Sequence, residues 1–376
     1  MSSMIVMFHT PSNAGYAMSP LERMFFNVAL AVCGKQENIH FTFKHLEGGF
    51  PKSLPEDFKN VIGFDNENPS IEDLSKLSQY IKENNIRLAL CFDLQPSSPT
   101  CKALRKGGVE RLVSYWGAPI SGINSGLKLA LKRMEIALRI SKPDLFIFES
   151  EAMRELGVSG RGLSYSSTIV IPTSVDTHKY SPDSTGKHYV SQAFGIPADR
   201  KIAFYSGHME RRKGVHVIIN AAIEIYEKGL SDQWHFLICG NKPGEKQVFL
   251  DTLSGTKAER YVTFGGYRSD LHKIMPGCDV GVVASTGWDS FPMSCLEMSS
   301  CGLPLVVSSL QGLKETLVDG TTGLLFEPGN YRELAEKLVQ IGEDSTVIAE
   351  FSVAARKRVV DEYSLDIQKQ RLLAQF

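Results

Sequence analysis

The stretch STGWDSFPMSCLEMSSCGLPLVVS, residues 285–308, decides the fold of this chain, because it joins two buried strands through a short helix. The run CDVGVVA at 278–284 predicts the first strand, residues 292–301 the helix, and LPLVVS at 303–308 the second strand. Strand, helix and strand at this spacing are typical of a βαβ unit in a parallel sheet, where ligands bind at the carboxyl ends of the strands.

The same alternation extends outward in both directions. In the second half the pattern predicts strands at 201–207, 234–240 and 261–266, and helices at 215–228, 268–275 and 331–341. In the first half it predicts strands at 4–9, 41–46, 87–92, 111–115, 145–148 and 169–172, and helices at 21–33, 71–84 and 126–140. Pro, Asp, Ser and Gly gather between residues 173 and 200, which marks a domain boundary. We therefore expect an α/β protein with two doubly wound domains.

Length and composition bound the function. A chain of 376 residues with 43% apolar residues is long enough for two domains. A net charge of −1 gives no overall field for nucleic acid, so no nucleic-acid partner is expected. The seven cysteines include no C-x-x-C pair, which favours a reduced, cytoplasmic compartment. No apolar run reaches 18 residues, so no membrane-spanning helix is expected.

The loop and helix start within 285–308 have the chemistry of an anion site. Ser290 is expected to cap the helix and Pro292 to occupy its first turn. Backbone N–H groups near Phe291, Met293 and Ser294 would then be free to bind a phosphate. Two carboxylates, Asp289 and Glu297, stand eight residues apart on either side of these groups. The alternative is a pair of surface carboxylates, one of which stabilises the helix dipole.

A second anion site is predicted in YSGHMERRKGVHVIINAA, residues 205–222, where the basic residues Arg211, Arg212 and Lys213 follow a strand and precede a helix. Arginine and lysine at a helix start suit a diphosphate, although a solvated charged loop is the alternative. Two such elements at the ends of two strands of one sheet favour a phosphate ligand.

These segments resemble the retaining family-4 glycosyltransferases of the GT-B fold. That family carries G-R-x4-K-G after the first strand of its C-terminal domain, then E-x7-E and A-x-G-x-P-V-V. This chain has Gly207-His208, Lys213-Gly214, Asp289-x7-Glu297 and Cys301-Gly302-Leu303-Pro304-Leu305-Val306-Val307, and the likeness continues through 315–320 and 322–326. The resemblance covers about 170 residues.

The resemblance implies a fold and a division of the chain. It implies two Rossmann-like domains facing each other across a cleft, with the C-terminal helix packing back on the N-terminal domain. The implied division is an acceptor-binding domain at 1–175, a linker at 176–199, a nucleotide-sugar-binding domain at 200–355 and the returning helix at 356–376.

The resemblance also assigns roles to residues. Lys213 would bind the donor diphosphate, Glu297 the ribose hydroxyls and Asp289 the hydroxyls of the transferred sugar. The backbone of Phe291, Met293 and Ser294 would meet phosphate and sugar, and Tyr267 and Arg268 would border the base. The residues expected to act in catalysis are Asp289, Lys213 and Arg212.

Three departures from the family pattern affect this assignment. His208 stands where the family usually has arginine, so Arg211 or Arg212 would supply the missing charge. Asp289 replaces the usual glutamate and reaches one methylene less far. In the stretch 113–119, Trp116 stands beside Tyr115 where a histidine near the transferred sugar is usual, so an aromatic wall is expected on the acceptor side.

Gly15, in the loop at 10–20, is expected to allow close backbone approach to a ligand, or else simply to make a turn.

No cofactor is expected. The chain contains no Asp-x-Asp and no histidine cluster at ligand spacing, and fixed cations with helix N–H groups would stabilise the leaving diphosphate without a divalent ion.

A basic segment lies in the first half. Residues 101–142 contain nine Lys or Arg and two Asp or Glu. The expected helix at 126–140 puts leucines and Met134 on one face and Lys128, Lys132 and Arg139 on another. Two interpretations stay open: the charged face is solvated, or residues 126–142 make a peripheral contact with a membrane that holds an anionic, lipid-linked acceptor.

The expected function is transfer of a hexose-type sugar from a UDP- or GDP-sugar to a saccharide, lipid-linked or small-molecule acceptor, as in cell-surface polysaccharide or glycoconjugate synthesis. The alternatives are a natural-product glycosyltransferase, a sugar phosphorylase or epimerase on the same fold, and a catalytically weak relative that binds nucleotide sugar. A Rossmann dehydrogenase is not expected, because no G-x-G-x-x-G follows a predicted strand.

Overall fold

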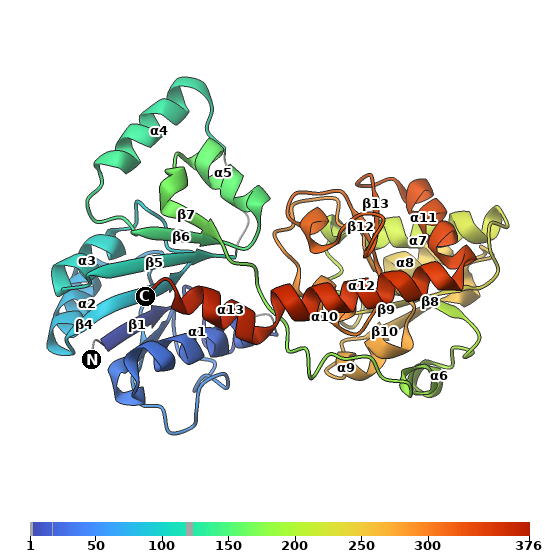
Figure 1. Ribbon diagram of the computed structural model, residues 1–376, viewed down its shortest axis with the longest axis horizontal. Helices are drawn as coiled ribbons and strands as arrows, with labels where there is room; N and C mark the ends of the chain where they lie inside the picture. The colour runs from blue at the N-terminus through green and yellow to red at the C-terminus, as the bar shows by residue number, and fades with distance from the viewer. Residues whose placement is uncertain (1–2, 17, 118–122) are drawn as a thin grey trace. The chain divides into compact units, whose positions relative to one another are not determined.

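The computed structural model describes residues 3–16, 18–117 and 123–376, which form two units, each built on a parallel sheet (Figure 1). Unit 1 consists of Met1–Thr173 with Asp366–Phe376, and unit 2 of Ser174–Leu365. The expected α/β architecture with two doubly wound sheets is therefore confirmed. Ala17, from the loop at 10–20, and Ala118 and Pro119, from the stretch at 113–119, lie outside the described residues.

Unit 1 has a seven-stranded sheet in the order β3-β2-β1-β4-β5-β6-β7. The strands are β1 (Ser3–Met7), β2 (Ile39–Phe43), β3 (Val61–Gly63), β4 (Ile86–Phe92), β5 (Arg111–Trp116), β6 (Leu145–Phe148) and β7 (Thr168–Val170). Val6 of β1 pairs with Phe41 of β2 on one side and with Leu90 of β4 on the other. The strand order therefore reverses between β1 and β4, which is where the loops of an open sheet diverge and leave room for a ligand.

Helices cover both faces of this sheet. They are α1 (Met18–Cys33), α2 (Ile71–Glu83), α3 (Pro99–Gly107), α4 (Gly126–Leu138), α5 (Glu151–Arg161) and α13 (Leu365–Leu373). The helices α1 and α13 pack on the face that carries Phe8 and Phe41, whereas α2 and α3 pack on the face of Ile5 and Met7. The start of α2 is fixed by a capping box between Ser70 and Asp73.

Unit 2 has a six-stranded sheet in the order β10-β9-β8-β11-β12-β13. The strands are β8 (Lys201–Ser206), β9 (Trp234–Cys239), β10 (Val262–Gly266), β11 (Val280–Val283), β12 (Leu305–Ser308) and β13 (Gly323–Phe326). The helices are α6 (Gly186–Phe194), α7 (Val215–Glu227), α8 (Gln247–Leu253), α9 (Leu271–Ile274), α10 (Met293–Ser300), α11 (Tyr331–Glu343) and α12 (Ser345–Tyr363). Here the order reverses between β8 and β11, the two strands that precede the predicted anion sites.

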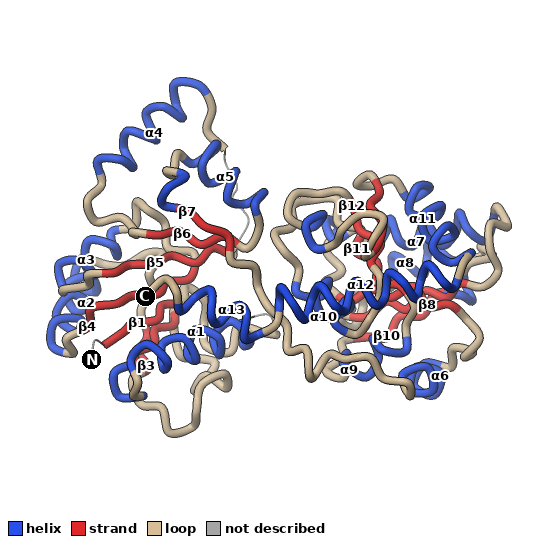
Figure 2. The backbone as a smooth tube through the Cα atoms, viewed as in Figure 1, coloured by secondary structure: helices blue, strands red, loops and turns tan. Residues whose placement is uncertain are grey.

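Two segments differ from the expected division of the chain. Residues 176–199, expected as a linker, contain α6, whose Val190 is fully buried in the core of unit 2. The last residues, 356–376, are not one helix: α12 ends at Tyr363 and α13 follows as a separate helix (Figure 2). The α13 helix packs in unit 1, where Leu372 is buried and Gln368 Nε2 donates to Tyr115 Oη at 3.3 Å.

Candidate functional site

The predicted anion sites of unit 2 lie at adjacent strand ends. The loop after β8 holds a short 3-10 turn, Arg211–Lys213, and leads to α7, while the loop after β11 leads to α10. Because β8 and β11 are neighbours in a parallel sheet, both loops leave the same edge at the reversal of strand order. The structure therefore brings together two segments that are about 70 residues apart in the sequence.

Lys213 and Asp289 join the two loops directly. Lys213 Nζ lies 2.9 Å from Asp289 Oδ2, and Ser285 Oγ donates to the same oxygen at 2.8 Å. The Asp289 side chain is 7% exposed, so this is an ion pair at the base of the loops and not a surface contact. A carboxylate in this position needs a cation, since an unpaired buried charge is strongly destabilising.

Arg212 holds the loop that follows β11. The backbone carbonyl of Arg212 accepts from the N–H of Thr286 at 2.7 Å and from that of Gly287 at 3.2 Å. Its guanidinium lies over the Trp288 ring, 4.1 Å from the centroid, and pairs with Glu210 at 2.7 Å. Arg212 therefore holds the loop, while Arg211 and His208 are exposed beside it.

Gly214 allows the close approach of the loops. It has φ of +73°, and a Cβ atom on it would lie 1.6 Å from the carbonyl oxygen of Ala284. Glycine is therefore required after Lys213 for two reasons: the positive φ and the lack of space for a side chain.

The start of α10 differs from the expectation in one detail. The helix begins at Met293, and its N-cap residue is Pro292, which makes no side-chain cap hydrogen bond, so Ser290 is not the N-cap residue. The N–H groups of Met293 and Ser294 open the first turn, where helix geometry provides no partner for them. Phe291 contributes only backbone, because its ring is 3% exposed and packs on Tyr363. Glu297 lies in the middle of the helix and is 3% exposed.

Tyr267 and Arg268 follow β10, and they differ in how firmly their side chains are held. Tyr267 is 67% exposed. Arg268 is held by Asp270 through two hydrogen bonds and lies over the Phe194 ring. The hydrogen bonds from Arg268, and a further one from Tyr189, lower the pKa of Asp270 to about 2. Arg268 is thus an ordered cation at the edge of the sheet, and Tyr267 is an open ring beside it.

Two nearby groups have perturbed pKa values because they are buried. Burial raises the pKa of the Tyr205 hydroxyl, which donates to the His208 carbonyl at 2.8 Å. Burial also raises the pKa of the Cys295 thiol to about 12. Both groups stay protonated at neutral pH, so neither provides a nucleophile.

The residues predicted on the acceptor side of unit 1 are not gathered on a surface. Tyr115 is completely buried and donates to the Ile171 carbonyl at 3.1 Å. Trp116 is 4% exposed, and its indole N–H donates to Ser114 Oγ at 2.8 Å. The aromatic wall expected from these two rings is therefore part of the core. Gly15 has φ of +122° with open space around its Cβ position, as in an exposed turn.

Polar residues that follow strands of unit 1 were not predicted from the sequence. His9 comes after β1, Asp93 after β4 and Glu149 after β6. The His9 ring stacks on Phe92, and Asp93 Oδ1 accepts from the Gly117 N–H at 3.0 Å. A titratable side chain immediately after a buried strand was the signal that could have identified them.

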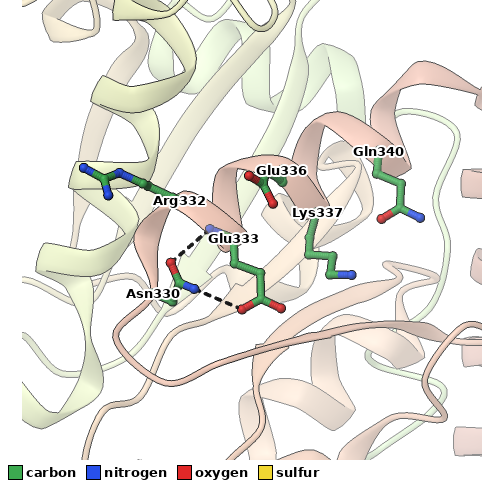
Figure 3. Close-up of a pocket in the computed structure, with 6 residues that line it drawn as sticks. All are labelled: Asn330, Arg332, Glu333, Glu336, Lys337 and Gln340. Atoms are coloured by element: carbon green, nitrogen blue, oxygen red, sulfur yellow. Dashed lines mark hydrogen bonds between the residues drawn. The ribbon is translucent and has the colours of Figure 1, made fainter.

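The described residues hold no group of three or more His, Cys, Asp and Glu placed to bind a metal ion. One depression in unit 2 is unrelated to the strand ends: it is lined by α11 and its capping residue Asn330, whose side chain bonds to Glu333 (Figure 3). Its other lining residues are Arg332, Glu336, Lys337 and Gln340.

Comparison with known proteins shows which family these features resemble. Residues 189–358 match the family described as glycosyl transferases group 1. The D-inositol 3-phosphate glycosyltransferase of Corynebacterium aurimucosum is 27% identical over 182 residues, which are 47% of this chain and 43% of that protein. The chain thus spans less than half the length of that relative.

A second relative matches over more of the chain. The N,N'-diacetylbacillosaminyl-diphospho-undecaprenol alpha-1,3-N-acetylgalactosaminyltransferase of Campylobacter jejuni is 24% identical over 281 residues, 70% of this chain and 68% of that protein. Among solved structures, HepE of Anabaena in complex with UDP has a TM-score of 0.77 at 19% identity, covering 99% of this chain and 98% of that one. The last comparison supports the fold, with two Rossmann-like domains.

Proposed function

We propose that this chain, whose residues 189–358 match the family described as glycosyl transferases group 1, transfers a hexose-type sugar from a nucleoside-diphosphate sugar. The donor is a UDP- or GDP-sugar, and the acceptor is a saccharide or a lipid-linked saccharide. The proposal rests on one observation. The ion pair of Lys213 with Asp289 and the first turn of α10 both follow the carboxyl ends of the neighbouring strands β8 and β11.

The chemistry needs stabilisation of one developing charge. Glycosyl transfer breaks the bond between the anomeric carbon and the phosphate oxygen, so negative charge grows on the leaving diphosphate. Lys213 and the N–H groups of Met293 and Ser294 can donate to that group, and the exposed Arg211 adds positive charge nearby. Such fixed donors lower the barrier because they need no reorganisation during the reaction. A hydrogen bond to a charged group contributes about 1.5–3 kcal/mol.

The carboxylates provide the polar contacts of the donor. In the proposed complex Glu297 accepts hydrogen bonds from the ribose hydroxyls and Asp289 accepts them from the transferred sugar. Lys213 Nζ lies 2.9 Å from Asp289 Oδ2, which supports a proposed complex with the diphosphate and the sugar next to each other. Tyr267 and Arg268 border the base. The reaction proceeds with retention of the anomeric configuration and without a divalent ion.

Relatives support the choice of ligands. The Campylobacter jejuni protein is named for a diphospho-undecaprenol acceptor, and HepE was solved with UDP. We therefore rank UDP-sugars first among donors and lipid diphosphate sugars first among acceptors. The proposed setting is cell-surface polysaccharide or glycoconjugate synthesis at the cytoplasmic side of a membrane, with a peripheral contact through residues 126–142.

A thermal-shift screen of UDP, GDP, ADP and their sugars tests the donor. A ligand at 100 times its dissociation constant adds about 2.7 kcal/mol of stability, which is a clear shift of the transition. The donor found is then used in a transfer assay with excess chelator, and NMR of the product gives the anomeric configuration. No shift with any nucleoside diphosphate would contradict the proposal.

Three alternatives have their own tests. A sugar phosphorylase would require inorganic phosphate for turnover. A natural-product glycosyltransferase would prefer small aglycones over lipid-linked saccharides. A catalytically weak relative would bind donor but show neither transfer nor donor hydrolysis. The observation that favours this alternative is His208, which is exposed and stands where the family has an arginine.

A further inference from the structure

The helix α4 presents its apolar side outward. The side chains of Leu127, Leu131, Met134 and Leu138 are 77%, 53%, 56% and 76% exposed, and Ile136 is the buried residue of the helix. The four exposed residues repeat at intervals of three and four, so they form one ridge along the helix. We call these four residues the α4 ridge. Its length, from residue 127 to residue 138, is about 16 Å at 1.5 Å per residue.

The exposure of the α4 ridge is not the result of an undocked helix. The segment is fixed to α5: Asn124, just before α4, donates to the Gly160 carbonyl from its backbone N–H at 2.9 Å and from its side-chain amide at 3.1 Å. A Cβ on Gly162, at the end of α5, would lie 3.0 Å from the backbone nitrogen of Arg133. Figure 1 shows α4 beside α5, above β6 and β7 of unit 1. The ridge therefore faces solvent while the helix itself is held.

A cationic depression lies beside the ridge. It has a volume of about 580 Å³ and is lined by Asn124, Lys128, Leu131, Lys132, Glu135 and Arg161. The single carboxylate is already neutralised, because Glu135 binds Lys132 at 2.9 Å and Arg139 at 2.7 Å. Three cations against one carboxylate leave the depression positive, and Leu131 belongs to both the ridge and the depression.

We infer that the α4 ridge enters the surface of an anionic membrane, and that the depression beside it binds a lipid phosphate. An apolar ridge bordered by cations is suited to the boundary between acyl chains and headgroups. The sequence left open whether the charged face of this helix is solvated or contacts a membrane, whereas the structure assigns the contact to the apolar face. No described helix is long and apolar enough to cross a membrane, so the contact is peripheral.

The cations beside the α4 ridge favour a membrane over a second copy of the chain as the partner of this surface. A second α4 ridge would bring its own Lys128 and Arg133 against the same cations, and like charges at a contact are unfavourable. An anionic lipid surface complements them. The inference rests on the proposed peripheral contact of this chain and is independent of its donor and its reaction.

The test is flotation of the full chain with vesicles of neutral phosphatidylcholine and with vesicles that contain about one third phosphatidylglycerol. The wild type is expected to float with the anionic vesicles. The double variant Leu127→Ser/Leu138→Ser should partition at least about tenfold less on both vesicle types. Lys128→Gln should lower binding to anionic vesicles by about fivefold and leave binding to neutral vesicles unchanged. High salt should remove the difference between the vesicle types but not the effect of the leucines.

Matched controls lie on unit 1 away from the ridge. Ile71→Ser removes a residue that is 89% exposed at the start of α2, and Lys106→Gln removes an exposed cation from α3; both should float like the wild type. The inference is overturned if the wild type does not float with anionic vesicles, or if the leucine variant floats as well as the wild type. It is also overturned if sedimentation shows a dimer that the leucine variant breaks. A UDP-induced thermal shift, measured on every variant, reports the donor site separately, so loss of lipid binding with an intact shift leaves the proposed reaction standing.

Discussion

Lys213 Nζ lies 2.9 Å from Asp289 Oδ2, so the cation assigned to the donor diphosphate and the carboxylate assigned to the sugar form one ion pair. The pair orders both loops. It also means that a diphosphate must share Lys213 with Asp289, since an ammonium group has three donors and can bind both.

Lys213→Met is expected to raise the dissociation constant of UDP by about 10- to 100-fold, because a charge-assisted hydrogen bond contributes about 1.5–3 kcal/mol. It should also lower the melting temperature, since Asp289 would remain buried without its cation. Isothermal titration calorimetry measures the first effect. Lys246→Met, which removes an exposed lysine of the same unit, is the control. An unchanged affinity in Lys213→Met would remove this lysine from the donor site.

Glu297→Gln separates the nucleoside from the diphosphate. If Glu297 binds the ribose hydroxyls, the variant should bind UDP about tenfold more weakly but inorganic diphosphate as well as the wild type does. Competition of each ligand against a fluorescent nucleotide measures both affinities. Glu343→Gln, an exposed carboxylate on α11, should change neither. Equal loss for both ligands would indicate a structural effect of the buried residue on α10.

Gly214→Ala is expected to destabilise unit 2 by more than about 4 kcal/mol, because the new methyl group would overlap the Ala284 carbonyl oxygen. Gly229→Ala is the matched control. It has φ of +62° with nothing within 4 Å of the Cβ position, so it should cost only the backbone term of about 1 kcal/mol. Denaturant unfolding gives both values. Similar losses in the two variants would show that the loops can move apart.

Unit 2 should lose stability as the pH falls from about 6.5 to about 4. Burial lowers the pKa of His235 to about 4, with a smaller contribution from Arg200, while in the unfolded chain the value is near 6.5. Between these values the unfolded state binds the extra proton, so stability is present above pH 6.5 and falls by about 3 kcal/mol at pH 4. Unfolding of unit 2 followed against pH should show a smaller slope in His235→Gln. The exposed His188→Gln should keep the slope of the wild type.

The sequence by itself determined the alternation of strands and helices, the parallel sheets and the two segments that form the predicted donor site. It could do so because the strands are short apolar runs and because Lys213-Gly214 and the Asp289–Glu297 spacing are local features. Short elements were harder to predict: β3, with only half-buried and exposed residues, and α6, inside a polar segment, carry little apolar pattern.

Tertiary structure alone decided which predicted side chains are accessible and which residues meet. The ion pair of Lys213 with Asp289 depends on β8 and β11 being neighbours, which no local pattern specifies. Tyr115 is buried because α13, from the far end of the chain, packs over it. The direction of the α4 ridge was also undetermined, since an amphipathic helix can bury either face, and in the structure the end of α5 lies against Arg133 while the leucines stay exposed.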